Sequence, residues 1–138
     1  SVIGADGDDD NGSSSGSVYL FQQPETGWTD MTQTAKLTAS DGASVDLLGW
    51  SVGVSGDYVI SSAFLDDDKG TDSGSIYIFK KPSGGWIDTH EVLKHTASDG
   101  AADDLFGISA AISGTKAIVG ANQDQDFGID TGAAYIFE

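Results

Sequence analysis

The stretch Asp66-Asp67-Asp68-Lys69-Gly70-Thr71-Asp72-Ser73-Gly74-Ser75-Ile76-Tyr77-Ile78-Phe79 joins an acidic loop to an apolar strand, and it decides the fold because it is repeated. In two further copies a similar loop leads into Gly16-Ser17-Val18-Tyr19-Leu20-Phe21 and into Gly132-Ala133-Ala134-Tyr135-Ile136-Phe137. The glycines that open these three strands are evenly spaced, because 74 − 16 and 132 − 74 both equal 58. A fixed period without gaps indicates a repeat architecture.

One period contains four strand-like pieces separated by turn signals, at residues 47–54, 58–63, 76–79 and 86–96. The first piece is rich in small residues that let backbones crowd together, and a Ser55-Gly56 turn connects it to the second as in a tight hairpin. The third piece is apolar on both faces, and the fourth is polar like an outer edge. A wedge of four antiparallel strands, repeated around an axis, makes a β-propeller. We therefore predict an all-β fold.

The composition limits the class of partner. The chain has 22 acidic and 6 basic residues, a net charge of −16, so its surface repels nucleic acid and anionic lipid. It has no cysteine, which excludes disulfides and thiolate metal sites, and no apolar run long enough for membrane insertion. The acidic surplus favours hard divalent cations.

The segment Leu105-Phe106-Gly107-Ile108-Ser109-Ala110-Ala111-Ile112-Ser113-Gly114, followed by Ala117 to Asn122, resembles the FG-GAP repeat. This repeat occurs in integrin α-subunit propellers and in many secreted microbial proteins. The resemblance implies a β-propeller that is extracellular, secreted or at the cell surface, and that acts in recognition or adhesion. Integrin blades carry their calcium loop between the first two strands, where this chain has only a short turn. Those sites are therefore not transferred by position.

The phase of the repeat predicts the blade content. Residues 1–45 form a partial blade that lacks its first strand, residues 46–103 a complete blade, and residues 104–138 a partial blade that lacks its last strand. This is about 2.4 blades, whereas closed propellers have roughly four to eight. We expect a segment of a larger propeller, completed by the rest of that propeller or by neighbouring chains.

The acidic loops are the best candidates for a metal site. Each has an Asp-x-Asp pair with a glycine two residues on, and two have a further aspartate. Alternating carboxylates before a glycine turn can surround a calcium ion with oxygen ligands. The alternative is a solvated acidic turn without metal. The candidate calcium ligands are Asp8, Asp10, Asp66, Asp68, Asp72, Asp124, Asp126 and Asp130.

Three further features have mainly structural interpretations. Asn11-Gly12-Ser13 is an N-glycosylation sequon and also a favoured turn sequence. The Asp41-Gly42 and Asp99-Gly100 turns before the first strand of a blade, followed by Asp46 and Asp104, are expected to be structural, because aspartate side chains commonly bond the amides of their own turn. Trp28 and Trp86 are expected to pack within blades, and the alternative is that they present a surface on which sugars stack.

The sequence favours a non-enzymatic scaffold. It has no cysteine nucleophile and no Gly-x-Ser-x-Gly or phosphate-loop motif, and carboxylates repeated in every blade do not single out one acid/base pair. We expect extracellular recognition or adhesion, stabilised by calcium, with a protein or carbohydrate ligand that the sequence does not identify. A structural self-assembly module is the alternative. A hydrolase or lyase with its site in the propeller channel is a weaker one.

Overall fold

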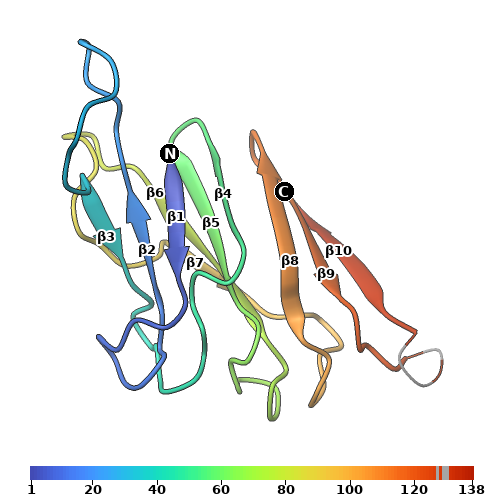
Figure 1. Ribbon diagram of the computed structural model, residues 1–138. Helices are drawn as coiled ribbons and strands as arrows, with labels where there is room; N and C mark the ends of the chain where they lie inside the picture. The colour runs from blue at the N-terminus through green and yellow to red at the C-terminus, as the bar shows by residue number, and fades with distance from the viewer. Residues whose placement is uncertain (127, 129–130) are drawn as a thin grey trace.

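The computed structural model describes residues 1–126, 128 and 131–138, which form three antiparallel sheets side by side (Figure 1). The first sheet has the order β1 (Val2–Ala5), β2 (Ser17–Leu20), β3 (Ala35–Leu37). The middle sheet has the order β4 (Val52–Ser55), β5 (Tyr58–Ala63), β6 (Ser75–Lys80), β7 (Leu93–His95). The third sheet consists of β8 (Phe106–Ser113), β9 (Lys116–Ala121) and β10 (Ala133–Phe137), with β9 in the centre.

The predicted all-β class with incomplete propeller blades is confirmed. One sheet has four strands and the sheets on either side have three, and all ladders are antiparallel. No helix among the described residues is long and apolar enough to cross a membrane. The assignment of the three sheets to one propeller domain, with boundaries after residues 45 and 103, stays a prediction.

The first strand of the middle blade is shorter than predicted. It begins at Val52, and upstream of it Leu47 and Gly49 have φ angles of 59° and 100°, outside the extended region. Leu48 instead forms a bridge with Gly16 of the first sheet. The hairpin turn is also displaced by one residue from the prediction: Ser55 pairs with Tyr58, so the turn residues are Gly56 and Asp57.

The fourth strand is also shorter than predicted, because most of residues 86–96 lie against a neighbouring sheet. Only Leu93–His95 pair with β6. Upstream of them, the Thr89 amide donates to the Lys36 carbonyl at 3.3 Å, and the Thr38 amide donates to the Thr89 carbonyl at 3.3 Å. These bonds place the segment parallel to β3. The connection between β6 and β7 therefore belongs as much to the first sheet as to the middle one.

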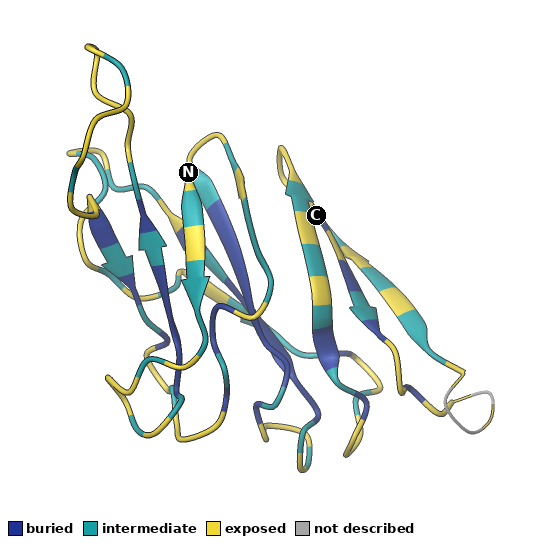
Figure 2. Ribbon diagram, in the orientation of Figure 1, coloured by how far each residue is buried: buried dark blue, intermediate teal, exposed yellow. Residues whose placement is uncertain are grey.

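Two apolar cores fill the spaces between the sheets. The core between the first and middle sheets contains Val18, Leu48 and Phe79, and Trp86 packs against it. The core between the middle and third sheets is built around Phe106. Strand β5 is buried along nearly its whole length, because a sheet covers each of its faces (Figure 2). Burial of apolar area between sheets is the main stabilising term for such a stack.

Neighbouring sheets approach most closely at the glycines before β2 and β6. A Cβ atom added to Gly74 would lie 2.0 Å from the Phe106 carbonyl oxygen, and one added to Gly16 would lie 2.0 Å from that of Leu48. Both glycines have a φ of 82°. The period therefore retains glycine at this position for two reasons, the left-handed backbone and the close contact. The acidic loops that precede these glycines lie together at the lower edge of the sheets in Figure 1.

Candidate functional site

The acidic loops have a common internal geometry. The second aspartate of each of the first two loops fixes the loop: the Asp9 carboxylate accepts from the Ser14 amide, and the Asp67 carboxylate accepts from the Asp72 amide, both at 2.8 Å. Such bonds are typical of aspartate in turns. The flanking aspartates are left to face the sheets, where they meet side chains from other elements.

In the middle sheet, a buried carboxylate is surrounded by donors. Asp66 is 4% exposed. It accepts hydrogen bonds from the Ser75 hydroxyl at 2.8 Å and from the Tyr77 hydroxyl at 2.9 Å. The ammonium of Lys94 lies 2.9 Å from the same carboxylate. Ser75 and Tyr77 both come from β6, which places their side chains on one face of the strand.

The Lys94 ammonium occupies the point on which the loop carboxylates converge. It lies 2.7 Å from an oxygen of Asp68 and 2.8 Å from an oxygen of Asp41. Asp41 belongs to the connection between β3 and β4, and it also accepts from the Tyr77 hydroxyl at 3.0 Å. We call Asp41, Asp66, Asp68 and Lys94 the second cluster. It connects the turn before the middle sheet to that sheet's last two strands.

The first sheet contains the same arrangement, which we call the first cluster: Asp8, Asp10 and Lys36. The Lys36 ammonium lies 2.9 Å from Asp8 and is also paired with Asp10. Asp8 accepts from the Tyr19 hydroxyl at 2.7 Å. In both sheets the lysine pairs directly with the tyrosine across the strand ladder, Lys36 with Tyr19 and Lys94 with Tyr77.

The third sheet has the carboxylates of this arrangement without the lysine. Oxygens of Asp99, Asp124 and Asp126 lie within 4.8 Å of one another, and we call these residues the third cluster. The Tyr135 hydroxyl lies 2.7 Å from Asp99 and 2.8 Å from Asp124. Among the described residues, no ammonium pairs with these carboxylates. The position equivalent to Lys94 in this repeat would be residue 152, outside the 138 residues of the sequence.

Comparison with known families agrees with the repeat. The sequence profile of the FG-GAP repeat matches residues 31–79 and residues 89–137, which together cover more than half of the chain. The chain belongs to the FG-GAP repeat family. The two matches begin at positions 31 and 89, so their spacing equals the period seen in the sequence. No curated protein matches the chain.

The FG-GAP match confirms the predicted family and fold. The three clusters show where the structure places the predicted aspartates of each repeat. The predicted pairs do converge: Asp8 with Asp10, Asp66 with Asp68, and Asp124 with Asp126. Asp72 contributes its backbone amide to Asp67 rather than joining the second cluster through a bond of its side chain. Asp130 lies outside the described residues.

Electrostatics differ between the FG-GAP copies that hold a lysine and the one that does not. The hydrogen bond from Tyr19, followed by that from Lys36, lowers the pKa of Asp8 to about 2. Burial opposes the charge of Lys94, but hydrogen bonds to Asp41, Asp68 and Asp66 outweigh it and raise the pKa of Lys94. In the third cluster, repulsion from Asp124 raises the pKa of Asp126. An uncompensated group of carboxylates favours a proton or another cation.

Calcium, which this family often binds, fits the three copies unequally. In the first and second clusters a lysine ammonium stands between the carboxylates, where a metal ion would have to be, so these residues do not fit calcium while the lysine is in place. The third cluster offers three carboxylates and no ammonium among the described residues, and its oxygen donors are of the kind that calcium prefers.

Sequence reasoning missed the lysines, the tyrosines and the contacts that Asp41 and Asp99 make with the next sheet. The carboxylates of Asp41 and Asp99 reach tyrosines of the following sheet. The predicted turn-fixing role is confirmed for Asp46 and Asp104, which accept from the amides of Ala43 and Ala101 at 2.6 Å. A signal was present: Lys36 and Lys94 are one full period apart in a chain that is poor in basic residues.

The remaining predicted site is the glycosylation sequon. Asn11 is exposed, and its side-chain amide donates to the Ala39 carbonyl at 3.1 Å. Its backbone amide donates to the Ser15 hydroxyl. Glycosylation at Asn11 stays a prediction.

Proposed function

We propose that this chain is part of a non-enzymatic extracellular propeller that serves as a scaffold for recognition or adhesion. The observation that carries the proposal is the second cluster, in which Asp41 from the first repeat is bonded to Tyr77 and Lys94 of the next. The charged groups of the second cluster are thus engaged in holding consecutive sheets together. A stack that is fixed in this way presents its loops in constant relative positions, as a recognition surface requires.

Membership of the FG-GAP family supports the extracellular part of the proposal, because such repeats are typical of extracellular and cell-surface proteins. The strongly acidic surface, with a net charge of −16, agrees with a protein or carbohydrate ligand rather than nucleic acid or membrane. The β2–β3 connection projects from one end of the stack and carries Trp28, which is 52% exposed (Figure 1). An exposed tryptophan on a projecting loop is a suitable contact residue.

The purified chain should be tested in parallel for binding and for turnover. Saturable binding to a purified extracellular protein or to a glycan on an array, weakened by Trp28→Ala, is the expected result. The enzymatic alternative is tested by a parallel assay for hydrolysis and elimination of polysaccharide and ester substrates. Turnover of any of these substrates by the chain would overturn the non-enzymatic assignment. Surface digestion of intact source cells with protease tests the location.

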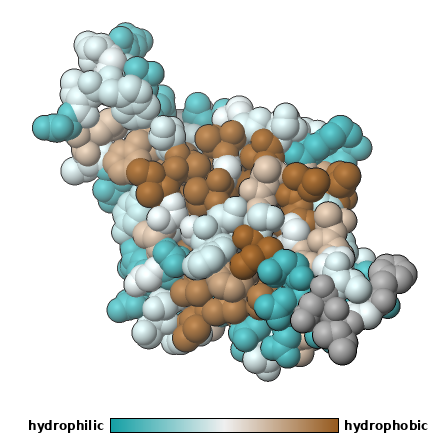
Figure 3. Space-filling view, turned by 45° about the vertical axis from the view of Figure 1, so that its right-hand side comes forward, coloured by the Kyte–Doolittle hydropathy of each residue, from teal (hydrophilic) through white to brown (hydrophobic). Residues whose placement is uncertain are grey.

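A self-assembly module is the second candidate, and one surface favours it. Ile118 and Ile136 on the third sheet are 51% and 74% exposed, whereas Ile60, equivalent to Ile118 in the middle sheet, is fully buried. Figure 3 shows apolar patches on the side of the molecule that carries this sheet. Replacing Ile136 with lysine should abolish any concentration-dependent association seen by sedimentation. A chain that stays monomeric at high concentration would exclude self-assembly through this face.

Calcium binding is proposed only for the third cluster and only while no ammonium occupies it, with Asp99, Asp124 and Asp126 as the ligands among the described residues. The support is the chemistry of the donors and the missing ammonium. Calorimetric titration of chelator-treated chain with calcium tests it, and Asp126→Asn is the matching variant. Absence of heat would exclude calcium binding at the third cluster and leave the scaffold proposal unaffected.

A further inference from the structure

The segment from the β6–β7 connection through β7 makes three contacts, and two of them are with the preceding sheet. Trp86 packs against the core between the first and middle sheets. Asp88 accepts from the Lys36 amide at 2.8 Å, and Thr89 forms the parallel bridge to β3. Further along the same segment, Lys94 enters the carboxylates of the second cluster. One segment therefore fills a groove with its tryptophan, pairs with the edge of β3 and supplies the cation of a charged cluster.

The order of these groups is the same in both copies of the segment. Trp28, Asp30 and Lys36 have the spacing of Trp86, Asp88 and Lys94, which is Trp-x-Asp-x5-Lys. The exposure of the two tryptophans differs, since Trp28 is 52% exposed while Trp86 is partly buried. The difference follows from position: Trp86 lies between the first and middle sheets, and among the described residues no further sheet lies on the other side of the first sheet to cover Trp28.

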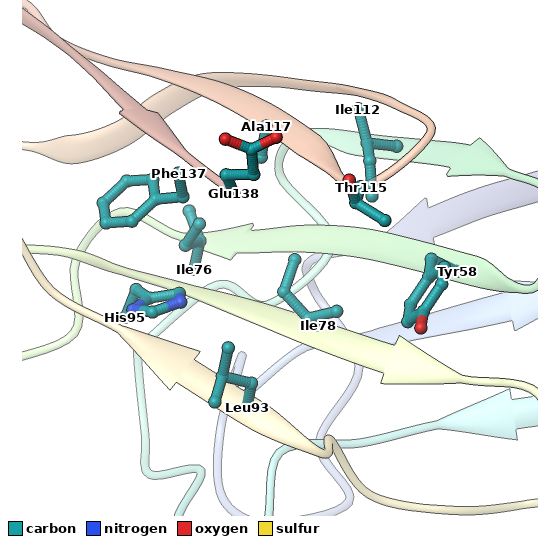
Figure 4. Close-up of a pocket in the computed structure, with 10 residues that line it drawn as sticks. All are labelled: Tyr58, Ile76, Ile78, Leu93, His95, Ile112, Thr115, Ala117, Phe137 and Glu138. Carbon is teal, nitrogen blue, oxygen red and sulfur yellow. The ribbon is translucent and has the colours of Figure 1, made fainter.

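The same receiving surface exists beside the third sheet, with its groove open. A groove of about 250 Å³ lies between the middle and third sheets, and its walls come from both (Figure 4). Five of its lining residues each lie one period further along the chain than a residue of the core against which Trp86 packs. Ile76, Ile78, Leu93, His95 and Phe137 line the groove, and Val18, Leu20, Ala35, Leu37 and Phe79 are their equivalents in the core that Trp86 covers.

The two strand edges beside this groove are also available. In the first sheet, the amides of Lys36 in β3 and of Thr38, just after β3, are bonded to Asp88 and Thr89. Their equivalents in the middle sheet are the amides of Lys94 in β7 and of Thr96, just after β7. Among the described residues, no strand pairs with the outer edge of β7 or with the outer edge of β10. Unpaired edges of this kind readily accept another strand.

Among the described residues, the third cluster lacks the ammonium that a lysine supplies in the first and second clusters. One tyrosine hydroxyl faces both Asp99 and Asp124, and a single hydroxyl hydrogen cannot satisfy two carboxylates at the same time. Asp124 is 2% exposed, so its charge is costly without a cation. In the other two copies the residue that pairs with the equivalent tyrosine across the ladder is a lysine.

We propose that the open side of the third sheet is a binding surface for an extended segment of the type Trp-x-Asp-x5-Lys. The indole fills the groove beside Phe137, the aspartate accepts from the amide of Lys94, and the lysine pairs with Tyr135 and inserts its ammonium into the third cluster. A charge of +1 then meets three carboxylates, as it does in the second cluster. This inference does not depend on what the propeller recognises.

A second copy of the chain is not a suitable donor of this segment. Its own Lys36 and Lys94 are already held by the carboxylates of its first and second clusters, and β3 and β7 are already paired with β2 and β6. Donation would require those ladders and ion pairs to be broken first. The occupant we assign is therefore a further segment of this chemistry that is not engaged in a sheet of its own.

A labelled peptide with the sequence of residues 80–98 of this chain is the direct probe, added to the full 138-residue chain and followed by fluorescence anisotropy. We expect saturable 1:1 binding. A peptide carrying Lys94→Gln should bind roughly tenfold more weakly, because a charge-assisted bond is lost, and so should one carrying Trp86→Ala. On the protein, Asp126→Asn should weaken binding by a similar factor. Asp30→Asn, at an exposed aspartate on the β2–β3 connection of the first sheet, is the control.

Charge reversal separates the specific site from general attraction to an acidic protein. Asp126→Lys should abolish binding of the natural peptide and improve binding of a peptide in which Lys94 is replaced by glutamate. Equal affinity of all peptides, or no saturable binding of the natural one, would overturn the proposal. Two other occupants would also overturn it: a dimer of the chain that the peptide does not dissociate, or calcium bound at Asp126 that the peptide does not displace.

Discussion

Lys94 lies directly opposite Tyr77 in the β6–β7 ladder, and its ammonium is 5.1 Å from the centre of the tyrosine ring. The lysine is thus placed by backbone pairing before any charge is considered. Its position over the ring adds a cation–π contact to the three carboxylates that it meets. The ladder, the ring and the carboxylates specify the same place for one atom.

Removal of this lysine should destabilise the chain strongly. Lys94→Met keeps the length of the side chain but leaves the buried Asp66 charge without its cation, and we expect a loss on the order of 3 kcal/mol in the free energy of unfolding. Urea denaturation measures it. Lys116→Met, which removes an exposed pair with Glu138, should cost less than about 1 kcal/mol. Equal losses in the two variants would show that the second cluster contributes no more than a surface pair.

The same lysine should determine whether the second cluster accepts a metal ion. In Lys94→Ala the carboxylates of Asp41, Asp66 and Asp68 are left facing one another, so calcium should raise the melting temperature of this variant by roughly 3 °C more than that of the unaltered chain. Magnesium is the control, because it dehydrates reluctantly and should have a smaller effect. An identical response of variant and unaltered chain to calcium would contradict the view that the ammonium occupies the cation position.

Asp46 should make stability depend on pH. Burial is the main cause that raises its pKa to about 6, from an ordinary value of 3.8. Between these values the folded chain holds a proton that the unfolded chain has lost, so the contribution of Asp46 to stability is greatest below pH 4 and declines as the pH rises to about 6.

Asp46→Asn should remove that dependence, since an amide oxygen can still accept from the Ala43 amide. The stability of the variant relative to the unaltered chain should be higher at pH 7 than at pH 4, by on the order of 2 kcal/mol. Unfolding curves at these two pH values provide the measurement. The exposed Asp30→Asn controls for the change in net charge. A pH-independent difference between variant and unaltered chain would rule out Asp46 as the titrating group.

Gly74 should tolerate no side chain. Alanine at this position would bring its Cβ to 2.0 Å from the Phe106 carbonyl oxygen, at a φ of 82°. We expect a loss of about 3 kcal/mol or more, or failure to fold. Gly84→Ala is a matched control, because nothing lies within 4 Å of the Cβ that it would add, and its effect should be within about 0.5 kcal/mol. Thermal unfolding of both variants would decide, and a stable Gly74→Ala chain would mean that the sheets are less tightly stacked there.

The period made most of the fold predictable from sequence. Strand β5 agrees with the predicted residues 58–63, because its apolar run is bounded by a turn on one side and the acidic loop on the other. Prediction failed where the chain leaves its own sheet. Leu48 and Thr89 both bond to a different sheet, and a linear pattern of polar and apolar residues contains no information about which neighbour a backbone group will choose.

The candidate site was predictable only in part, for a related reason. The Asp-x-Asp spacing singled out Asp66 and Asp68 as candidate calcium ligands, and both carboxylates contact the same ammonium. The spacing could not indicate that this cation comes from Lys94, which lies two strands further along the chain. A lysine in a short edge strand has the pattern of a solvated residue. Its role depends on the strand ladder, which sets Lys94 beside Tyr77.

The crossing of residues 88–91 along β3 has a consequence for how such a protein can gain or lose repeats. The first sheet receives its outer edge from the repeat that follows, through Asp88, and the middle sheet receives a carboxylate from the repeat that precedes, Asp41. The unit that can be inserted, deleted or exchanged without damage is therefore not a sheet but any span of one full period, wherever it starts. A graft that transfers one sheet alone would lose the edge contact on one side of that sheet and the carboxylate contact on the other.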